Sequence, residues 1–435
     1  MSTDAAAPVA VVGAGVIGAC TALRLAREGR RVVLVDRLDP GEGCSFGNAG
    51  AISPAAVVPM ALPGMLRKVP GWLRDPDGPL VVRPGYALRA APWLARWVLA
   101  SRRSAVQRSS DALAALNRDT LDGYRDLLDA DQFADLIRVA GHLYAFRSRP
   151  AAAGGRLAQA LRERHGVRTR WLDAGELRAL EPALAPAYAC GLLLPDNGQT
   201  VNPQRLVLTL AGNLAACGGR VLRDEVRHVE VRGGRLELVA AGGRVPASAV
   251  VLATGAWSRA LLRALGTDVP LETERGYHLM LEDASVTPGR PTMLADRKFF
   301  ATPMEHGLRL AGTVEFAGLD APADWRRAQA LLRHAQAAFP ALRASRWTQW
   351  LGHRPSLPDS VPVIDRLPQA GVFVAAGHGH LGMSGGPGTA RLVADLVAGR
   401  RPFVDPAPYR HDRFGLRGAP RVPATPAHEA RPLGR

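Results

Sequence analysis

Two short apolar runs near the N-terminus, residues 9–12 and 32–35, have the length and the β-branched composition of buried strands. Between them, apolar residues over 19–30 recur with a helical period. Together they predict a βαβ unit, in which a helix joins two parallel strands. Similar apolar runs at residues 249–253 and 371–376 each lead into a turn of small residues, so further strands of the same kind are expected there.

Other parts of the chain have a different pattern. Residues 105–128 predict one long amphipathic helix, and a helix is also expected over 152–166. Asn202 precedes a further helix, with Pro203 suited to its first turn. After that helix, residues 220–231 and 235–239 predict two strands that Gly233 and Gly234 join as a hairpin.

The turn after the first predicted strand has the residues that a dinucleotide phosphate requires. Gly13 permits a tight turn, Gly15 lets a pyrophosphate approach the backbone, and Gly18 lets the helix pack closely on the strand. The helix N-terminus offers free N–H groups to the phosphates. Asp36 ends the second strand, where a carboxylate can hold an adenosine ribose hydroxyl. The unit predicts a site for an adenine dinucleotide; the alternative is a glycine turn without a ligand.

The composition limits the class of protein and of partner. With 435 residues and 47% hydrophobic residues, the chain is long enough for two or three structural units. Its formal net charge of +16 comes almost wholly from arginine, since Lys68 and Lys298 are the only lysines. This charge would suit an anionic membrane, a nucleic acid or an acidic partner, but a solvated arginine-rich surface is the simpler interpretation.

The cysteines and the N-terminus indicate the compartment. Cys20, Cys44, Cys190 and Cys217 are far apart, which argues against a zinc ribbon or a disulfide framework and fits a reducing compartment. The first eight residues lack the basic and apolar regions of a signal peptide, and no apolar run approaches the length of a membrane span. We therefore expect a cytoplasmic protein without a metal site, with contact at the inner face of the membrane as an option.

Four motifs, in this order, resemble the D-amino-acid oxidase superfamily of flavoproteins. They are the glycines of residues 13–18, the loop Ser45…Gly47-Asn48-Ala49-Gly50, the turn Ala253-Thr254-Gly255, and Gly377-His-Gly-His-Leu-Gly-Met383. Two more stretches, Glu274-Arg-Gly-Tyr-His278 and Arg354-Pro-Ser-Leu-Pro-Asp-Ser-Val-Pro-Val-Ile364, are similar to bacterial D-amino-acid dehydrogenases. Some relatives of that kind act on hydroxy-D-proline. The resemblance extends from residue 8 to residue 412.

The resemblance implies an α/β fold in two domains. A discontinuous Rossmann-like domain would bind FAD, and a second α+β domain built on a mixed sheet would bind the substrate. The expected ranges are 1–100, 200–270 and 355–415 for the FAD-binding domain, 101–199 and 271–354 for the substrate domain, and 416–435 for a basic, flexible tail.

The resemblance also implies how FAD is held. The cofactor would be non-covalent, because residues 346–365 contain no cysteine where relatives of the sarcosine oxidase type attach their flavin. The helix after Met383 would point its N-terminus at the flavin and stabilise the negative charge of its reduced form. Relatives usually carry Glu in place of Asp36, but the shorter acid can still reach the ribose. The implied cofactor-binding residues are Gly13, Gly15, Val16, Ile17, Gly18, Asp36, Arg37, Ser45, Asn48, Ala49, Val226, Thr254, Gly255, Gly377, His380, Leu381, Gly382 and Met383.

An amino acid substrate offers a carboxylate, which a buried arginine pairs bidentately. Arg354 lies in a stretch that resembles the family's carboxylate-binding position and is the first candidate. Its alternative role is an internal ion pair with Asp359 or Asp365. Arg275 is the second candidate, with a bridge between domains as its alternative role.

Tyr277 and His278 are expected to point toward the flavin and to orient the amine or line the pocket; the alternative for each is a packing role. His380 can contact the substrate or serve the turn. His353 is a weaker candidate, and we assign no general base.

The expected reaction is FAD-dependent oxidation of a D-amino acid, or of a cyclic imino acid such as hydroxy-D-proline. A hydride would pass from the α-carbon to flavin N5, and the electrons would reach a quinone or another acceptor besides oxygen. The tryptophans and arginines of residues 57–103 would either rest on an anionic membrane or form a lid over the flavin. The alternatives are a glycine or sarcosine type of secondary amine oxidase and a flavoprotein subunit of a larger amine dehydrogenase. Nucleic acid binding is disfavoured, because the sequence has no aromatic and basic stacking platform.

Overall fold

The computed structural model of the chain describes residues 7–67, 69–149, 155–233 and 235–415. The basic tail expected at 416–435 lies outside these residues, as does part of the helix expected at 152–166. No helix in the described part of the chain has the length and apolar content needed to cross a membrane.

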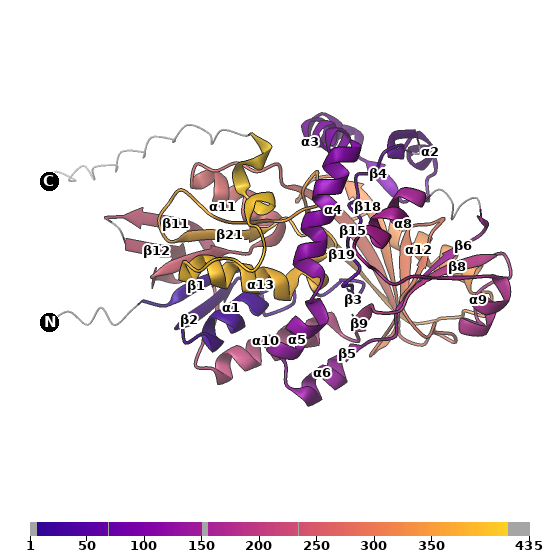
Figure 1. Cartoon of the computed structure of the whole chain (residues 1–435), viewed down its shortest axis with the longest axis horizontal. Coiled ribbons are helices and arrows are strands. Elements are labelled where there is room, and N and C mark those ends of the chain that lie inside the picture. Colours follow the sequence, from indigo (N-terminus) through magenta and orange to yellow (C-terminus); the bar gives the residue numbers. More distant parts are fainter. Residues whose placement is uncertain (1–6, 68, 150–154, 234, 416–435) are drawn as a thin grey trace, which may run out of the picture.

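A six-stranded sheet brings together three distant parts of the chain (Figure 1). In spatial order its strands are β10 (Arg220–Arg223), β2 (Val32–Asp36), β1 (Val9–Val12), β14 (Ala249–Leu252), β21 (Val372–Ala376) and β20 (Val363–Arg366). The first five run parallel, and β20 is antiparallel to β21. The strands β1, β14 and β21 are buried along their whole length because both faces of the sheet are covered.

Alternate residues of β1 enter two different hydrophobic cores. Val9 and Val11 pack under helices, whereas Ala10 and Val12 face a small antiparallel sheet. The helices on the first face are α1 (Val16–Arg27), α10 (Pro203–Ala216) and α13 (Gly382–Ala398). On the second face lie α11 (Ser258–Ala264) and the sheet of β11 (Val226–Arg232), β12 (Arg235–Ala240) and β13 (Gly243–Ala247). The β11–β12 hairpin and the start of α10 at Pro203 confirm two predictions from the sequence.

A nine-stranded mixed sheet forms the other lobe, on the right of Figure 1. Its strands, in spatial order, are β19 (Trp347–Ser356), β15 (Glu272–Leu281), β18 (Gly307–Phe316), β17 (Phe299–Met304), β16 (Thr292–Leu294), β6 (His142–Phe146), β8 (Cys190–Leu194) and β7 (Arg170–Leu172), with β4 (Leu80–Val82) on the side of β18. Helix α12 (Arg326–Ala338) packs against one face of it. The α/β class with a mixed second sheet, expected from the sequence, is confirmed.

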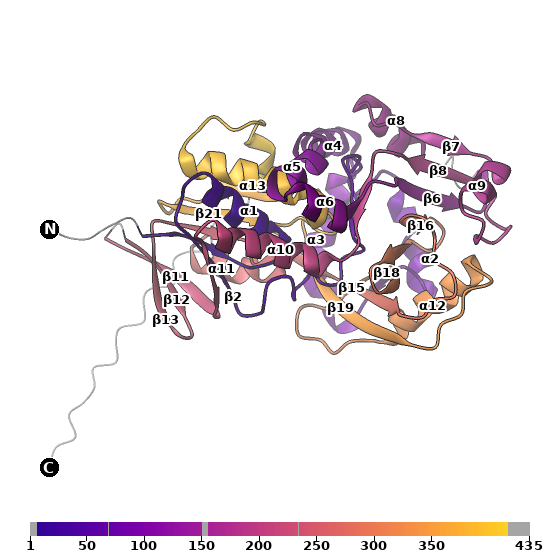
Figure 2. The ribbon, with the colours of Figure 1, turned by 90° about the horizontal axis from the view of Figure 1, so that it is seen from below.

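The remaining elements connect and flank the two lobes. A short sheet joins β3 (Ala51–Ile52), β9 (Gly198–Thr200) and β5 (Ile137–Arg138). The α-helices are α2 (Val69–Arg74), α3 (Ala87–Ala100), α4 (Arg103–Asn117), α5 (Thr120–Leu127), α6 (Ala130–Leu136), α8 (Arg156–Arg164) and α9 (Ala174–Leu180). Single 3-10 turns are η1 (Met65–Arg67), η2 (Pro84–Tyr86), η3 (Gly255–Trp257), η4 (Ala407–Tyr409) and η5 (His411–Phe414). Figure 2 shows the lobes from below, with α5, α6 and α10 toward the middle of the view.

The prediction of one helix over 105–128 is wrong, because the helix breaks between α4 and α5. Beyond the break, the hydroxyls of Thr120 and Tyr124 donate to the carbonyls of Ser384 and Met383, 2.6 and 2.7 Å away. These two bonds hold α5 against the start of α13.

The prediction of one strand over 220–231 is also wrong, since β10 and β11 belong to different sheets. The chain turns at Asp224, whose backbone N–H donates to the carbonyl of Asp36 and whose carboxylate accepts from Gly242. The last residues of β10 thereby stay with the parallel sheet while β11 leaves it.

The division of the chain into the two expected domains stays a prediction, and two segments pack otherwise than its ranges. Residues of α4 and α5 belong to the core of α1 and α13. Trp93 of α3 packs on Phe316 of the nine-stranded sheet, with ring centroids 5.3 Å apart.

Candidate active site

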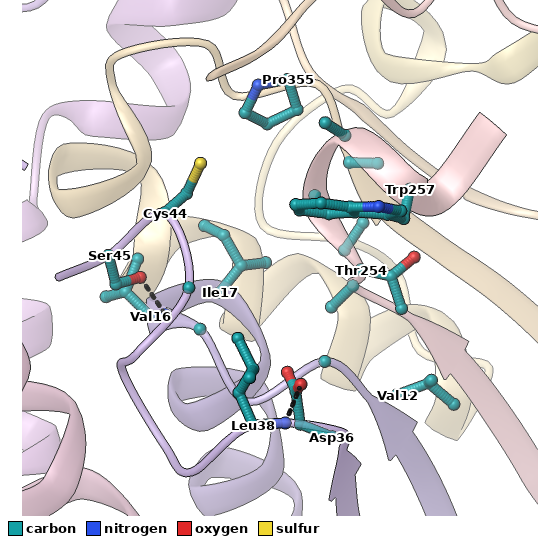
Figure 3. Close-up of a pocket in the computed structure, with 18 of the residues that line it drawn as sticks. Val12, Val16, Ile17, Asp36, Leu38, Cys44, Ser45, Thr254, Trp257 and Pro355 are labelled. Atoms are coloured by element: carbon teal, nitrogen blue, oxygen red, sulfur yellow. Dashed lines mark hydrogen bonds between the residues drawn. The ribbon is translucent and has the colours of Figure 1, made fainter. Parts of the chain in front are cut away.

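A cleft of about 450 Å³ opens where the parallel strands end (Figure 3). Val12, Asp36, Ala253 and Ala376 line it, and they stand at or just after the carboxyl ends of β1, β2, β14 and β21. Ligands of open parallel sheets bind at this edge. The arrangement therefore places a ligand site where the glycine turn predicts one.

Two helices begin at this cleft. Val16 and Ile17 of α1 and Gly382 and Met383 of α13 line it. The hydroxyl of Ser45 accepts from the backbone N–H of Val16 at 2.9 Å, as Figure 3 shows. Two positive helix ends at one cleft favour an anionic ligand.

The three glycines of the turn have different surroundings. Gly13 has a φ of +109°, and a Cβ there would lie 2.4 Å from the carbonyl oxygen of Ala253. At Gly18 a Cβ would lie 1.7 Å from the carbonyl oxygen of Gly13. At Gly15 a Cβ would meet only the Ser45 hydroxyl, at 3.3 Å, and would occupy the cleft. Gly13 and Gly18 thus serve the fold, whereas Gly15 leaves room for a ligand.

The far end of the cleft fits an adenosine. The Asp36 carboxylate accepts from the N–H of Ala14 at 2.6 Å and of Leu38 at 3.0 Å, and it faces the cleft. The Arg37 guanidinium lies over the ring of Trp257, 4.6 Å from its centroid. With the glycines and the two helix ends, this donor set suits the pyrophosphate and ribose of FAD.

Most of the residues that the sequence predicts for the cofactor line this one cleft. Gly18, Ala49, Gly377, His380 and Leu381 do not. Cys44, Trp257, Pro355, His378 and Gly379 line it and were not selected from the sequence, although each stands within or close to one of the motifs. The predicted residues that line the cleft are Gly13, Gly15, Val16, Ile17, Asp36, Arg37, Ser45, Asn48, Val226, Thr254, Gly255, Gly382 and Met383.

Arg354, on β19 next to the cleft residue Pro355, is held by backbone rather than by an acid. Its guanidinium donates to the carbonyls of Thr313 at 2.8 Å and Gly312 at 3.3 Å. Thr313 has a φ of 60°, which is rare for a β-branched residue. Gly276 faces the same guanidinium, and a Cβ there would lie 2.1 Å from it.

Burial lowers the pKa of the Arg354 guanidinium; the charge of the neighbouring Glu274 opposes that shift, but the described chain has no acid within ion-pair distance of Arg354. The internal partners considered above are occupied elsewhere: Asp359 pairs with Arg413 at 2.9 Å, and Asp365 contacts His411. A desolvated guanidinium without an acid partner is a ready site for a carboxylate.

Three titratable groups, His380, Cys44 and Glu274, lie near Arg354. His380 is exposed, yet the protein around it and Arg354 lower its pKa to about 4. Cys44 is half-buried, its thiol donates to the carbonyl of His353, and burial raises its pKa to about 11. Glu274 is buried, and burial raises its pKa. Of these groups Cys44 also lines the cleft, so the surroundings of Arg354 border the proposed ligand site.

Arg275 and Tyr277 lie on the opposite face of β15 from Arg354, because neighbouring residues of a strand alternate in direction. The Tyr277 hydroxyl donates to Glu315 at 2.7 Å, and Arg275 pairs with the same carboxylate at 3.4 Å. The prediction that Tyr277 and His278 both point toward the flavin is therefore wrong for Tyr277. Glu315 binds both of the residues on this face, which was not visible in the sequence.

His278 lies on the same face of β15 as Gly276. Its ring stacks on Trp350 at 5.2 Å, and its Nδ1 contacts the carbonyl of Gly47 at 3.2 Å. Arg309, which the sequence gave no reason to select, donates to the carbonyls of Phe46 and Asn48 at 2.9 and 2.7 Å. The nine-stranded sheet thus holds the loop around Asn48 that lines the cleft.

His353 lies on the other face, where its ring meets Trp257 at 5.4 Å. Within the described residues, no group of three or more histidines, cysteines and acids is placed to hold a metal ion.

Comparison with known proteins gives one family over most of the chain. Residues 8–396 match the family described as FAD dependent oxidoreductase (DAO). A D-amino-acid oxidase of Bradyrhizobium diazoefficiens is 39% identical over 415 residues, 93% of this chain and 98% of that protein. A D-amino acid dehydrogenase of Ralstonia nicotianae is 35% identical, over 92% of this chain and 99% of that protein. The structure of a glycine oxidase from Geobacillus kaustophilus superposes with a TM-score of 0.70 at 25% identity, covering 94% of this chain and 98% of that one.

Proposed function

The chain belongs to the family of FAD-dependent oxidoreductases, and from this premise we propose that it oxidises D-amino acids, or a cyclic relative such as hydroxy-D-proline, to imino acids. Similar proteins named D-amino-acid oxidase and D-amino acid dehydrogenase support this substrate class. FAD, when bound, accepts the hydride that leaves the α-carbon. The imino acid then hydrolyses in water to the 2-oxo acid.

The observation that carries the proposal is Arg354. Its guanidinium belongs to the residue next to the cleft residue Pro355, forms no ion pair in the described chain, and donates to the carbonyls of Gly312 and Thr313. In this role Arg354 binds the substrate carboxylate and holds the α-carbon over the cleft. His380 is close enough to Arg354 for its pKa to be lowered by that charge, and His278 lies on the Arg354 face of β15, so both are candidates to contact the substrate.

The cleft residues take the roles that follow from their positions. Gly15 and the start of α1 would bind the pyrophosphate, and Asp36 the ribose. The start of α13 would stabilise the negative charge of the reduced flavin. Cys44 stays protonated because burial raises its thiol pKa to about 11, which supports non-covalent FAD.

The first experiment is anaerobic addition of D- and L-amino acids, glycine, sarcosine and hydroxy-D-proline to the FAD-loaded protein. Loss of the flavin absorbance with a D-amino acid is the expected result. Flavin that no amine reduces would contradict the proposal. The variant Arg354→Lys keeps the positive charge but loses the planar guanidinium that pairs with both carboxylate oxygens, so we expect KM to rise about 100-fold. Arg326→Lys, at a side chain that is 87% exposed, is the matched control and leaves KM unchanged.

A second candidate is oxidation of glycine or of a secondary amine such as sarcosine. The likeness to a glycine oxidase structure supports it. The same panel separates the two, because this alternative requires reduction by glycine or sarcosine and little by larger D-amino acids.

We propose a quinone as the electron acceptor, reached at a membrane surface. Leu66 of η1, Leu73 of α2, and Leu88 and Leu99 of α3 are exposed. Residues 57–110 contain nine basic residues and only two acids, which favours an anionic surface. Fast reoxidation by a soluble quinone and slow reoxidation by air would support the proposal, as would salt-sensitive binding to phosphatidylglycerol vesicles. Fast reoxidation by air alone would contradict it.

A further inference from the structure

Glu274 lies beside the proposed carboxylate site. In the register of β15 and β19 it stands opposite Arg354, and the Cβ atoms of such a pair lie about 5 Å apart. Gly276, two residues on, shares this face and leaves room for the Arg354 guanidinium. Glu274 is 8% exposed, so its side chain is within the protein.

The carboxylate of Glu274 forms no ion pair within the described chain, and its partner is the hydroxyl of Ser356. The other acid on this face is satisfied, because Tyr86 donates to both oxygens of Glu272, at 2.9 and 3.1 Å. The charged and titratable groups that face Glu274 are therefore Arg354, Glu272 and, through Arg354, His380 and Cys44. Of the two acids on this face, Glu274 is the one that stands opposite Arg354 in the strand register.

An amino acid bound through its carboxylate places its nitrogen two bonds from that carboxylate carbon. At neutral pH this nitrogen is an ammonium, and no hydride can leave the α-carbon until it loses a proton. We propose that Glu274 accepts this proton from the α-ammonium of the substrate that Arg354 binds. An N–H bond breaks, its electron pair stays on nitrogen, and an O–H bond forms on Glu274, with no change of oxidation state.

Burial supports this role because it favours the neutral form of Glu274. The neighbouring guanidinium of Arg354 opposes that effect, and a substrate carboxylate paired with it offsets its positive field at Glu274. Substrate binding therefore makes Glu274 a better proton acceptor. This inference rests on the proposed function, since it requires an amino acid at Arg354.

The test uses two ligands that differ only in the amine. 2-Aminoisobutyrate has no hydrogen on its α-carbon and cannot be oxidised, and isobutyrate is the same skeleton without nitrogen. Binding of each to the FAD-loaded protein is followed by the change in flavin absorbance. For Glu274→Gln we expect 2-aminoisobutyrate to bind at least tenfold more weakly, and isobutyrate to bind equally or more tightly because a negative charge is removed. Equal weakening of both would mean that Glu274 only positions Arg354, and no change in either would also overturn the proposal.

A second measurement is the pH profile of flavin reduction under anaerobic rapid mixing. In Glu274→Gln the rate should rise tenfold per pH unit up to the pKa of the substrate amine, since only free amine reacts. The wild type should reach its plateau at lower pH. Glu274→Asp keeps an acceptor and should restore the wild-type profile in part, even if Glu274→Gln folds poorly.

Glu272→Gln is the matched control, because it removes an acid of the same face whose oxygens Tyr86 already occupies. It should keep the shape of the wild-type profile. If no amino acid reduces the flavin of the wild type, the proposed function fails; if the wild type is reduced and Glu274→Gln has the same profile, only this inference fails.

Discussion

At the scale of single residues, the carboxylate site depends on a missing side chain. Gly276→Ala would put a methyl group 2.1 Å from the Arg354 guanidinium, which must then leave the carbonyls of Gly312 and Thr313. We expect isobutyrate to bind at least tenfold more weakly, a loss of about 1.4 kcal/mol, while FAD binding persists. Titration of both ligands checks this.

The control for that change is Gly212→Ala. Gly212 is exposed within α10, and a Cβ there meets nothing within 4 Å. This variant should bind isobutyrate normally and gain up to about 1 kcal/mol of stability, because alanine favours the helix. Unchanged isobutyrate binding in Gly276→Ala would show that Arg354 does not bind the carboxylate.

At the scale of elements, the turn between β1 and α1 separates a structural from a ligand-binding glycine. Gly13→Ala forces a side chain into a φ of +109° and to 2.4 Å from a carbonyl oxygen, so we expect a loss of about 3 kcal/mol in unfolding free energy. Gly15→Ala should stay within about 0.5 kcal/mol of the wild type. It should nevertheless bind FAD at least tenfold more weakly, because its methyl group occupies the cleft. Denaturant unfolding of the apoprotein and FAD titration measure the two effects, and equal FAD affinity in Gly15→Ala and wild type would refute the assignment.

The elements that could be predicted from the sequence are those with a local signal. Apolar runs and a glycine turn gave the βαβ unit, and the side chain of Asn202 gave the start of α10. The break between α4 and α5 had no such signal, since hydrogen bonds to α13, far along the chain, determine it. The site shows the same limit. Strand alternation could have excluded that Tyr277 and His278 share a face, but only the register of β15 with β19 reveals that Glu274 and Gly276 share the face of Arg354.

At the scale of the whole molecule, three buried histidines link stability to pH. Burial lowers the pKa of His142 to about 4 and the pKa values of His278 and His378 to about 3. His142 is neutral in the fold, since Nε2 donates to Gly198 while Nδ1 accepts from Asn197. In the unfolded chain these histidines gain a proton below a pH of about 6.5. Stability is therefore fully present above that pH and is lost as the pH falls toward the folded pKa values.

Between pH 7 and pH 5 each of these histidines removes up to about 2 kcal/mol of unfolding free energy. Carboxylates with lowered pKa values, such as Asp283 at about 2, titrate below this window. Burial raises the pKa of Glu181, which therefore offsets part of the loss.

His142→Asn should lose less unfolding free energy between pH 7 and pH 5 than the wild type, by up to about 2 kcal/mol, as measured by urea unfolding at both pH values. His306→Asn, at a side chain that is 70% exposed, should keep the wild-type loss. If His142→Asn lost as much stability as the wild type, the buried neutral state of His142 could not be one of the sources of the pH dependence.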